Sequence, residues 1–124
     1  MQQASDYELE VMKIIWANGG TAMYAEIVTG LEAKGCSFTK NTMLTLLSRL
    51  TDKEMLKTSK SGRRNIYTAT VSENDYQADQ TMRFLDKIYD GSTKGLVSTL
   101  ITKNLLSKSE YDDLQSQWGD DNAD

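Results

Sequence analysis

The first half of the chain places apolar residues at the spacing of α-helices, with short polar breaks between them. This spacing predicts helices over residues 6–17, 24–34 and 38–53. Gly20 and Gly35 follow the first two helices, and glycine tolerates the left-handed backbone that ends many helices. Because few residues separate the second helix from the third, the two form a candidate helix-turn-helix.

Beyond residue 53 the spacing changes from helical to alternating. Residues 55–60 and 65–71 each fit a β-strand, and Gly62 in the Ser-Gly-Arg-Arg segment between them suits a hairpin turn. Thr21 and Ala22 fit a short bridging strand. Helices followed by a hairpin are typical of the winged-helix fold. We therefore predict a mainly α protein with a small β-hairpin, in which a winged helix-turn-helix domain covers residues 1–72.

Helical spacing returns after residue 72 and predicts three helices: one capped by Ser72 or Asn74 that ends near residue 89, a short one marked by the apolar residues of 96–101, and a last one striped by Tyr111, Leu114 and Trp118. A capping box of Ser107 and Glu110 opens the last of them. The acidic residues that follow, from Gly119 onward, are predicted to fray.

The apolar stripes of these C-terminal helices have no globular core of their own to cover them. About fifty residues of this kind would expose apolar surface in a single chain, and a two-fold dimer would bury it. We therefore predict a helical dimerisation domain over residues 73–124, with folding back onto the first domain as the alternative. The predicted interface residues are Met82, Leu85, Ile88, Tyr89, Leu96, Val97, Leu100, Ile101, Leu114 and Trp118.

The helix predicted over residues 38–53 has an unusual polar face. Its buried stripe is predicted to consist of Met43, Leu46, Leu47 and Leu50, and Thr39 suits the N-cap. Small hydrogen-bonding groups and two cations dominate the other face, which is the set of side chains that reads base edges and holds phosphates. A solvated amphipathic helix is the alternative. The residues of this polar face are Lys40, Asn41, Thr45, Ser48, Arg49 and Asp52.

The formal net charge of −4 hides an asymmetry along the chain. Residues 1–71 carry nine Lys or Arg against seven Asp or Glu, whereas residues 72–124 carry five against eleven. Residues 37–64 alone carry seven basic and two acidic side chains. Such a concentration of cations is the footprint of a nucleic-acid-binding protein. The cations near the predicted turn are Lys60, Arg63 and Arg64. They are predicted to contact phosphates, with solubility of the hairpin tip as the alternative.

The residue inventory excludes several classes of function. The chain has no histidine and one cysteine, Cys36, so the usual zinc sites and Ser-His or Cys-His nucleophile pairs cannot form within one chain. The acidic side chains are expected on solvent-exposed faces or in the tail, so we predict no catalytic site, metal or cofactor. No run approaches the ~18 apolar residues of a membrane span, and the N-terminal stretch lacks the features of a signal peptide. With a single cysteine, a reducing, cytoplasmic location is expected.

Four stretches closely resemble the BlaI/MecI/CopY family of penicillinase and copper-response repressors. They are VMKIIW at 11–16, TKNTMLTLLSRLTDKEML at 39–56, GRRNIYTATV at 62–71 and FLDKIYDGSTKGLV at 84–97. The resemblance covers nearly the whole chain. It implies a winged-helix N-terminal domain, a helical dimerisation region, and repression at a palindromic operator that in this family commonly contains TACA/TGTA half-sites.

Matched position by position, the resemblance implies roles for residues of the third helix and the hairpin. Leu44 departs from the arginine of antibiotic-response members, so the base preference is expected to differ. Arg49 fits a base contact, a phosphate contact or an ion pair with Asp52 on the next turn. The residues that match the family's recognition helix are Lys40, Asn41, Thr42, Thr45 and Arg49, and those in its wing are Arg63 and Arg64.

Induction separates the members of this family. Copper-response members carry a C-terminal Cys-x-Cys metal site, and this chain has only Cys36. Antibiotic-response members are inactivated by proteolysis at an Asn-Phe bond in the dimerisation region, and the equivalent position here is Thr99-Leu100. A cut there would remove the last helix and weaken the dimer. The alternative is that Thr99 is a solvated helix residue and Leu100 an ordinary core residue.

The leading hypothesis is therefore a homodimeric repressor that binds an operator in double-stranded DNA. The resemblance implies control of a β-lactamase or cell-wall-antibiotic response and release by a sensor-controlled protease. Two alternatives stay open. One is a regulator of the same fold induced by a small molecule, with Met82, Phe84 and Tyr89 lining the pocket. The other is a winged-helix module that binds a protein through its C-terminal stripes.

Overall fold

The computed structural model describes the backbone of residues 1–121 and the side chains of residues 1–118. The chain divides into two compact units, Met1–Gln80 and Thr81–Asp124, each described by itself below. The first unit contains α1 (Asp6–Ala17), β1 (Thr21–Met23), α2 (Tyr24–Ala33), α3 (Lys40–Asp52), β2 (Leu56–Ser61), β3 (Arg64–Ala69) and the start of α4 (Glu73–Tyr89). The second holds the rest of α4, α5 (Thr93–Thr102) and α6 (Lys108–Asp121).

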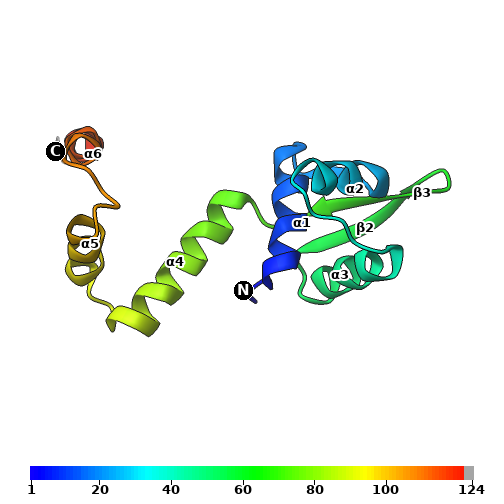
Figure 1. The fold of residues 1–124 in the computed structure, drawn as a ribbon, viewed down its shortest axis with the longest axis horizontal. Helices are drawn as coiled ribbons and strands as arrows, with labels where there is room; N and C mark the ends of the chain where they lie inside the picture. The colour runs from blue at the N-terminus through cyan, green and yellow to red at the C-terminus, as the bar shows by residue number, and fades with distance from the viewer. Residues whose placement is uncertain (122–124) are drawn as a thin grey trace. The chain divides into compact units, whose positions relative to one another are not determined.

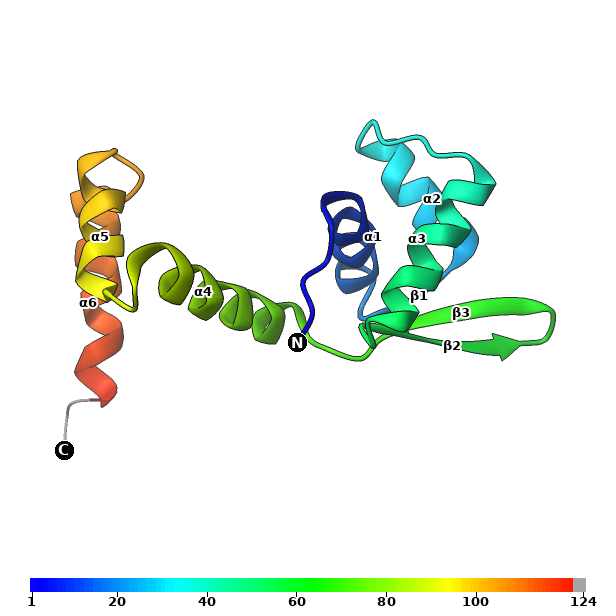
Figure 2. The same ribbon diagram turned by 90° about the horizontal axis from the view of Figure 1, so that it is seen from below.

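The three strands form one antiparallel sheet in the order β1-β3-β2. Ser61 pairs with Arg64, which leaves Gly62 and Arg63 as a two-residue turn. Gly62 has φ +65°, and a type II′ hairpin turn requires such a value at its first central position. The predicted hairpin is confirmed, and Figures 1 and 2 show it projecting beyond the helices of this unit.

The core of the first unit lies between the helices and the sheet. The stripe predicted for α3, which is Met43, Leu46, Leu47 and Leu50, is buried in full. These side chains pack with Met12 and Ile15 of α1, Ile27 and Leu31 of α2, and Tyr67 of β3. The predicted mainly helical winged-helix fold is confirmed, because three helices and the hairpin share one apolar core.

Glu8 departs from the expectation that every acidic side chain lies on a solvent-exposed face. Its side chain is only 2% exposed. It accepts hydrogen bonds from the backbone N–H of Ser5 at 3.2 Å and from Lys53 Nζ at 2.5 Å. Ser5 Oγ accepts from the Glu8 N–H in return, which completes a capping box for α1. Burial raises the pKa of Glu8, but the hydrogen bonds from Lys53 and Ser5 and the Lys53 charge together lower it below its usual value.

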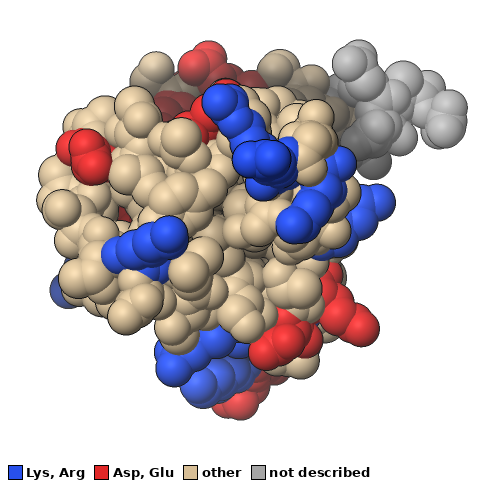
Figure 3. All heavy atoms as spheres, turned by 90° about the vertical axis from the view of Figure 1, so that its right-hand side faces the viewer, with Lys and Arg blue, Asp and Glu red and all other residues tan. Residues whose placement is uncertain are grey.

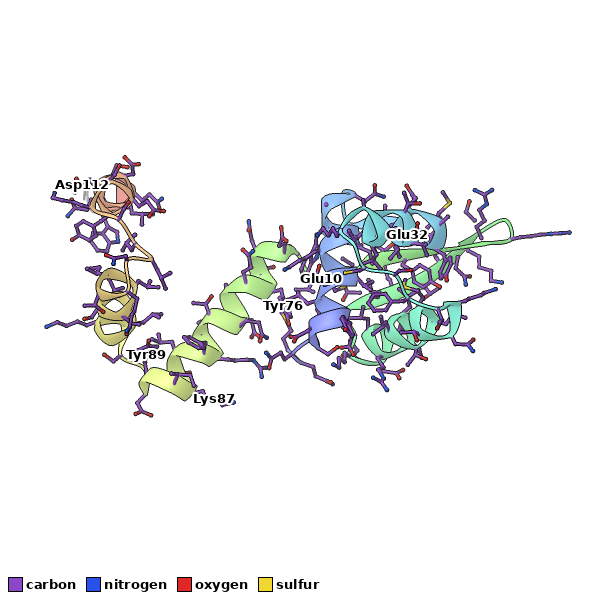
Figure 4. The ribbon with its side chains drawn as sticks, in the orientation of Figure 1. Glu10, Glu32, Tyr76, Lys87, Tyr89 and Asp112 are labelled. Atoms are coloured by element: carbon purple, nitrogen blue, oxygen red, sulfur yellow. The ribbon has the colours of Figure 1, made fainter. Side chains whose placement is uncertain are left out.

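The first turns of α4 pack on the winged helix. Tyr76, labelled in Figure 4, is buried, and its hydroxyl accepts a hydrogen bond from the Ala4 N–H at 2.9 Å. Its ring lies 5.7 Å from that of Trp16, whose Nε1 donates to the Val71 carbonyl at 2.9 Å. The first compact unit therefore extends to Gln80, whereas the sequence places the domain boundary at residue 72.

The second unit has little core of its own. Ser107 and Glu110 form the predicted reciprocal hydrogen bonds at the start of α6, with 3.0 Å and 3.1 Å separations. From Thr81 to Trp118 none of the described side chains is buried. α6 continues to Asp121, past the predicted end at 118, and the prediction of fraying for residues 122–124 lies outside the described residues.

Candidate nucleic-acid interface

The start of α3 is held by a network of threonine hydroxyls. Thr39 is the N-cap, and its Oγ1 accepts from the Thr42 N–H at 3.2 Å while donating to Thr42 Oγ1 at 3.0 Å. Thr45 Oγ1 donates to the Asn41 carbonyl at 2.9 Å. The Thr42 hydroxyl accepts within the helix, so it can still donate a hydrogen bond to a ligand. The Thr45 hydroxyl donates within the helix, so it can still accept one.

The predicted polar face of α3 is exposed along its whole length. Lys40, Asn41 and Arg49 all point away from the core. The structure shows no ion pair between Arg49 and Asp52 among its described side chains. A guanidinium that is not held by the next turn is free to bind a phosphate or a base edge.

The hairpin adds three exposed cations to this end of the unit. Lys60 of β2 pairs with Asn65 on the sheet face that also carries Tyr67, because alternate strand residues share a face. Arg63 lies in the turn, and Arg64 Nη1 approaches Met23 Sδ at 3.9 Å. In Figure 3, Lys and Arg side chains lie on several parts of this end, separated by uncharged surface, and acidic side chains lie mainly toward its edges.

The helix-turn-helix and the hairpin meet around a hollow of about 460 Å³. Its lining brings together three of the predicted site residues, Lys40, Arg63 and Arg64. The other predicted DNA-binding residues are not part of this lining; they are Thr39, Asn41, Thr42, Thr45, Arg49 and Lys60. The other residues that line the hollow are Met23, Tyr24, Ala25, Leu44, Asn65 and Tyr67.

The start of α2 is the part of this site that the sequence analysis missed. Met23, Tyr24 and Ala25 reach the hollow because β1 pairs with β3, with Met23 opposite Ile66. The sequence feature that could have indicated the start of α2 was the predicted helix-turn-helix, because the first helix of this motif crosses the DNA backbone in known complexes.

Lys53 lies in the cationic segment, but its ammonium is less available to bind a phosphate than this position suggests. Its ammonium donates to the buried Glu8 carboxylate and to the Gln3 carbonyl at 3.0 Å. One of the seven cations counted between residues 37 and 64 is therefore neutralised inside the unit.

The predicted interface residues of the second unit are exposed or half-buried. Met82 is 59% and Trp118 63% exposed, and Ile88, Ile101 and Leu114 are exposed as well. The half-buried members are Leu85, Tyr89, Leu96, Val97 and Leu100. α5 and α6 run alongside each other (Figure 2) and line a hollow of about 370 Å³, with Val97, Tyr111, Leu114 and Trp118 among its walls.

Thr99 and Leu100 lie inside α5. Both side chains are half-buried, and Thr99 Oγ1 donates to the Gly95 carbonyl at 3.2 Å. The bond between them is therefore helical, so a protease would have to unwind this turn before cutting it. Phe84 and Tyr89, suggested above as pocket residues, pack ring edge to ring face with centroids 5.8 Å apart.

Two features of the described residues bear on other functions. None of their helices is long and apolar enough to cross a lipid bilayer. Their His, Cys, Asp and Glu side chains form no group of three or more that could hold a metal ion.

The fold and this cationic face define a winged helix-turn-helix protein. Comparison with known families then assigns the chain to one family of such proteins. The sequence model of the family described as penicillinase repressor matches residues 4–120, so the chain belongs to that family. The family consists of DNA-binding transcriptional repressors and is not a class of enzymes.

Relatives and solved structures agree with this assignment. The chain is similar to the penicillinase repressor of Bacillus licheniformis, with 34% identity over 90% of this chain and 86% of the relative. The Staphylococcus aureus penicillinase repressor is 32% identical over 87% of this chain and 84% of its own length. The solution structure of monomeric B. licheniformis BlaI in complex with the blaP half-operator matches with a TM-score of 0.50. It is 39% identical and covers 60% of this chain and 89% of that chain.

Proposed function

We propose that this chain is a dimeric transcriptional repressor that binds a palindromic operator in double-stranded DNA. The observation that carries the proposal is the cationic face on which α3 and the hairpin meet, in a chain of the penicillinase repressor family. The similar BlaI protein was solved with a half-operator, which supports the same kind of ligand here.

In this proposal α3 enters the major groove. Asn41 has the amide geometry to pair with adenine, and Arg49 can pair with guanine or hold a phosphate. The Thr42 hydroxyl donates and the Thr45 hydroxyl accepts, as their internal hydrogen bonds dictate. Lys60, Arg63 and Arg64 of the hairpin bind backbone phosphates, which fixes the register without reading sequence.

The second unit supplies the dimer. Its helices leave large apolar side chains such as Met82, Ile88 and Trp118 exposed, and a second copy of the chain would cover them. A two-fold dimer presents two α3 helices to two half-sites, which explains a palindromic operator. The full chain is expected to sediment as a dimer at micromolar concentration, and a monomer there would contradict this part of the proposal.

Binding is tested by selecting duplexes from a random pool with the full chain and measuring affinity over a range of salt. Replacing Asn41 or Arg49 with alanine should cost about 1–3 kcal/mol if either side chain reads a base. Replacing Arg63 or Arg64 should weaken all duplexes alike and lower the salt slope by about one each. The control is Lys108→Ala in α6, which also removes an exposed cation, one paired with Asp112 at 3.3 Å.

The outcomes separate the parts of the proposal. If neither Asn41→Ala nor Arg49→Ala changed operator affinity, α3 would not be the recognition helix. If Lys108→Ala reduced affinity as much as Arg63→Ala, the effect would be one of net charge and not of a defined face.

The regulatory role extends the proposal. Membership of the penicillinase repressor family supports a further part of the proposal: in the cytoplasm the chain controls a β-lactamase or cell-wall-antibiotic response, and a sensor-controlled protease releases it by cleavage between Thr99 and Leu100. Cleavage there would detach α6 from α4 and remove part of the apolar surface that holds the dimer. Fragment masses from induced cells test this, and an intact chain at full induction would rule it out.

A further inference from the structure

Leu44 is an apolar side chain on the polar face of α3. It is 42% exposed, while the other leucines of the helix are buried. All residues of α3 are described, and among them Leu44 alone is both apolar and exposed. Leu44 is not part of the buried stripe of α3, to which the nearby Met43 and Leu47 belong.

One of the two hollows that Leu44 lines combines apolar walls with a cationic rim. Leu44 lines the hollow of about 460 Å³ together with the apolar or aromatic side chains of Met23, Tyr24, Ala25 and Tyr67. Lys40, Arg63 and Arg64 also line it, and the described lining includes no acidic residue. An occupant with an apolar group and nearby negative charge fits these walls better than an apolar peptide does.

We propose that Leu44 selects thymine at one position of each half-site, by contact with its 5-methyl group. This inference rests on the proposed function, in which α3 lies in the major groove. The thymine methyl is the apolar group among the base edges in that groove, and apolar side chains recognise it. Lys40, Arg63 and Arg64 then hold phosphates beside the methyl. The methyl group would explain the apolar side chains that line the hollow, and the phosphates would explain the cationic ones.

The test replaces single thymines of a selected operator by deoxyuridine, which removes only the methyl group. One such change in a half-site should weaken binding of the full chain about fourfold, the value of one buried methyl. Leu44→Ala should weaken binding to the thymine operator and abolish the difference between thymine and uracil. Leu44→Met is the matched control, because it keeps an apolar side chain of similar size and should keep the preference.

Leu44 is exposed, so its variants should retain the thermal unfolding of the native chain, and this is checked by circular dichroism. If the native chain binds its operator but no thymine responds to loss of its methyl, the inference is wrong while the proposed function stands. The inference is also wrong, and the proposed function still stands, if Leu44→Ala keeps the full preference for thymine over uracil. If the native chain binds no duplex at all, the proposed function fails and this inference fails with it.

Discussion

The buried Glu8–Lys53 ion pair gives a quantitative test of how the winged helix is held together. In Glu8→Gln the side chain keeps its shape and its Oε1 can still accept from the Ser5 N–H and from Lys53, but the bond from Lys53 is no longer a charge-assisted bond to a carboxylate. Such a bond contributes about 1.5–3 kcal/mol. Lys53 is 24% exposed and can regain water, so the loss stays below the larger cost of leaving a fully buried charge unpaired. We expect the free energy of unfolding to fall by about 2 kcal/mol at pH 7.

The pH dependence follows from the lowered pKa of Glu8. The folded state favours the ionised carboxylate, so its contribution is present above the ordinary pKa of 4.5 and is lost as the pH falls through the folded value. The stability gap between the native chain and Glu8→Gln should therefore be constant near neutrality and shrink below pH 4.5. Urea unfolding at fixed protein concentration, followed by circular dichroism from pH 7 to pH 3, measures this gap.

Glu10→Gln is the matched control. Glu10 is on the same helix, and its contacts with Lys13 at 3.7 Å and Lys34 at 3.9 Å are long and partly exposed. Such pairs contribute about 0–1 kcal/mol. An equal loss in both variants, or a gap for Glu8→Gln that did not change down to pH 3, would refute the assignment of this energy to the buried pair.

Two further substitutions test other parts of the first unit. Tyr76→Phe leaves the buried Ala4 N–H without its acceptor and should cost about 1–3 kcal/mol, with faster hydrogen exchange at Ala4. Unchanged protection of that amide would contradict the hydrogen bond. Gly62→Ala meets no atom within 4 Å but must adopt φ +65°, so it should lower stability by about 1–2 kcal/mol in urea unfolding. A more stable variant would show that the turn has a different backbone conformation.

The elements themselves could be predicted because their signals are local. The apolar spacing in α3, the Thr39 cap and the glycine in the hairpin turn all act within a few residues of the chain. The cations at this end of the unit were likewise visible as a charge cluster in the sequence. Their roles in binding DNA stay predictions.

What could not be predicted depends on contacts between distant residues. Glu8 looks like a solvated helix residue until Lys53, 45 positions later, is placed beside it. Tyr76 and Ala4 are 72 positions apart, and their hydrogen bond extends the first unit into α4. The start of α2 joins the site through the β1–β3 register, which no local pattern specifies.

The strand order leaves β2 at one edge of the sheet, on a hairpin that reaches out from the unit. An open strand edge invites the strands of other molecules to add to it, and proteins discourage this with lysine. Beyond Leu56 every residue of β2 is exposed and polar, and two of them are Lys57 and Lys60. The same positive charge that suits a phosphate backbone would therefore also repel another copy of this hairpin, which opposes edge-to-edge pairing of two such strands.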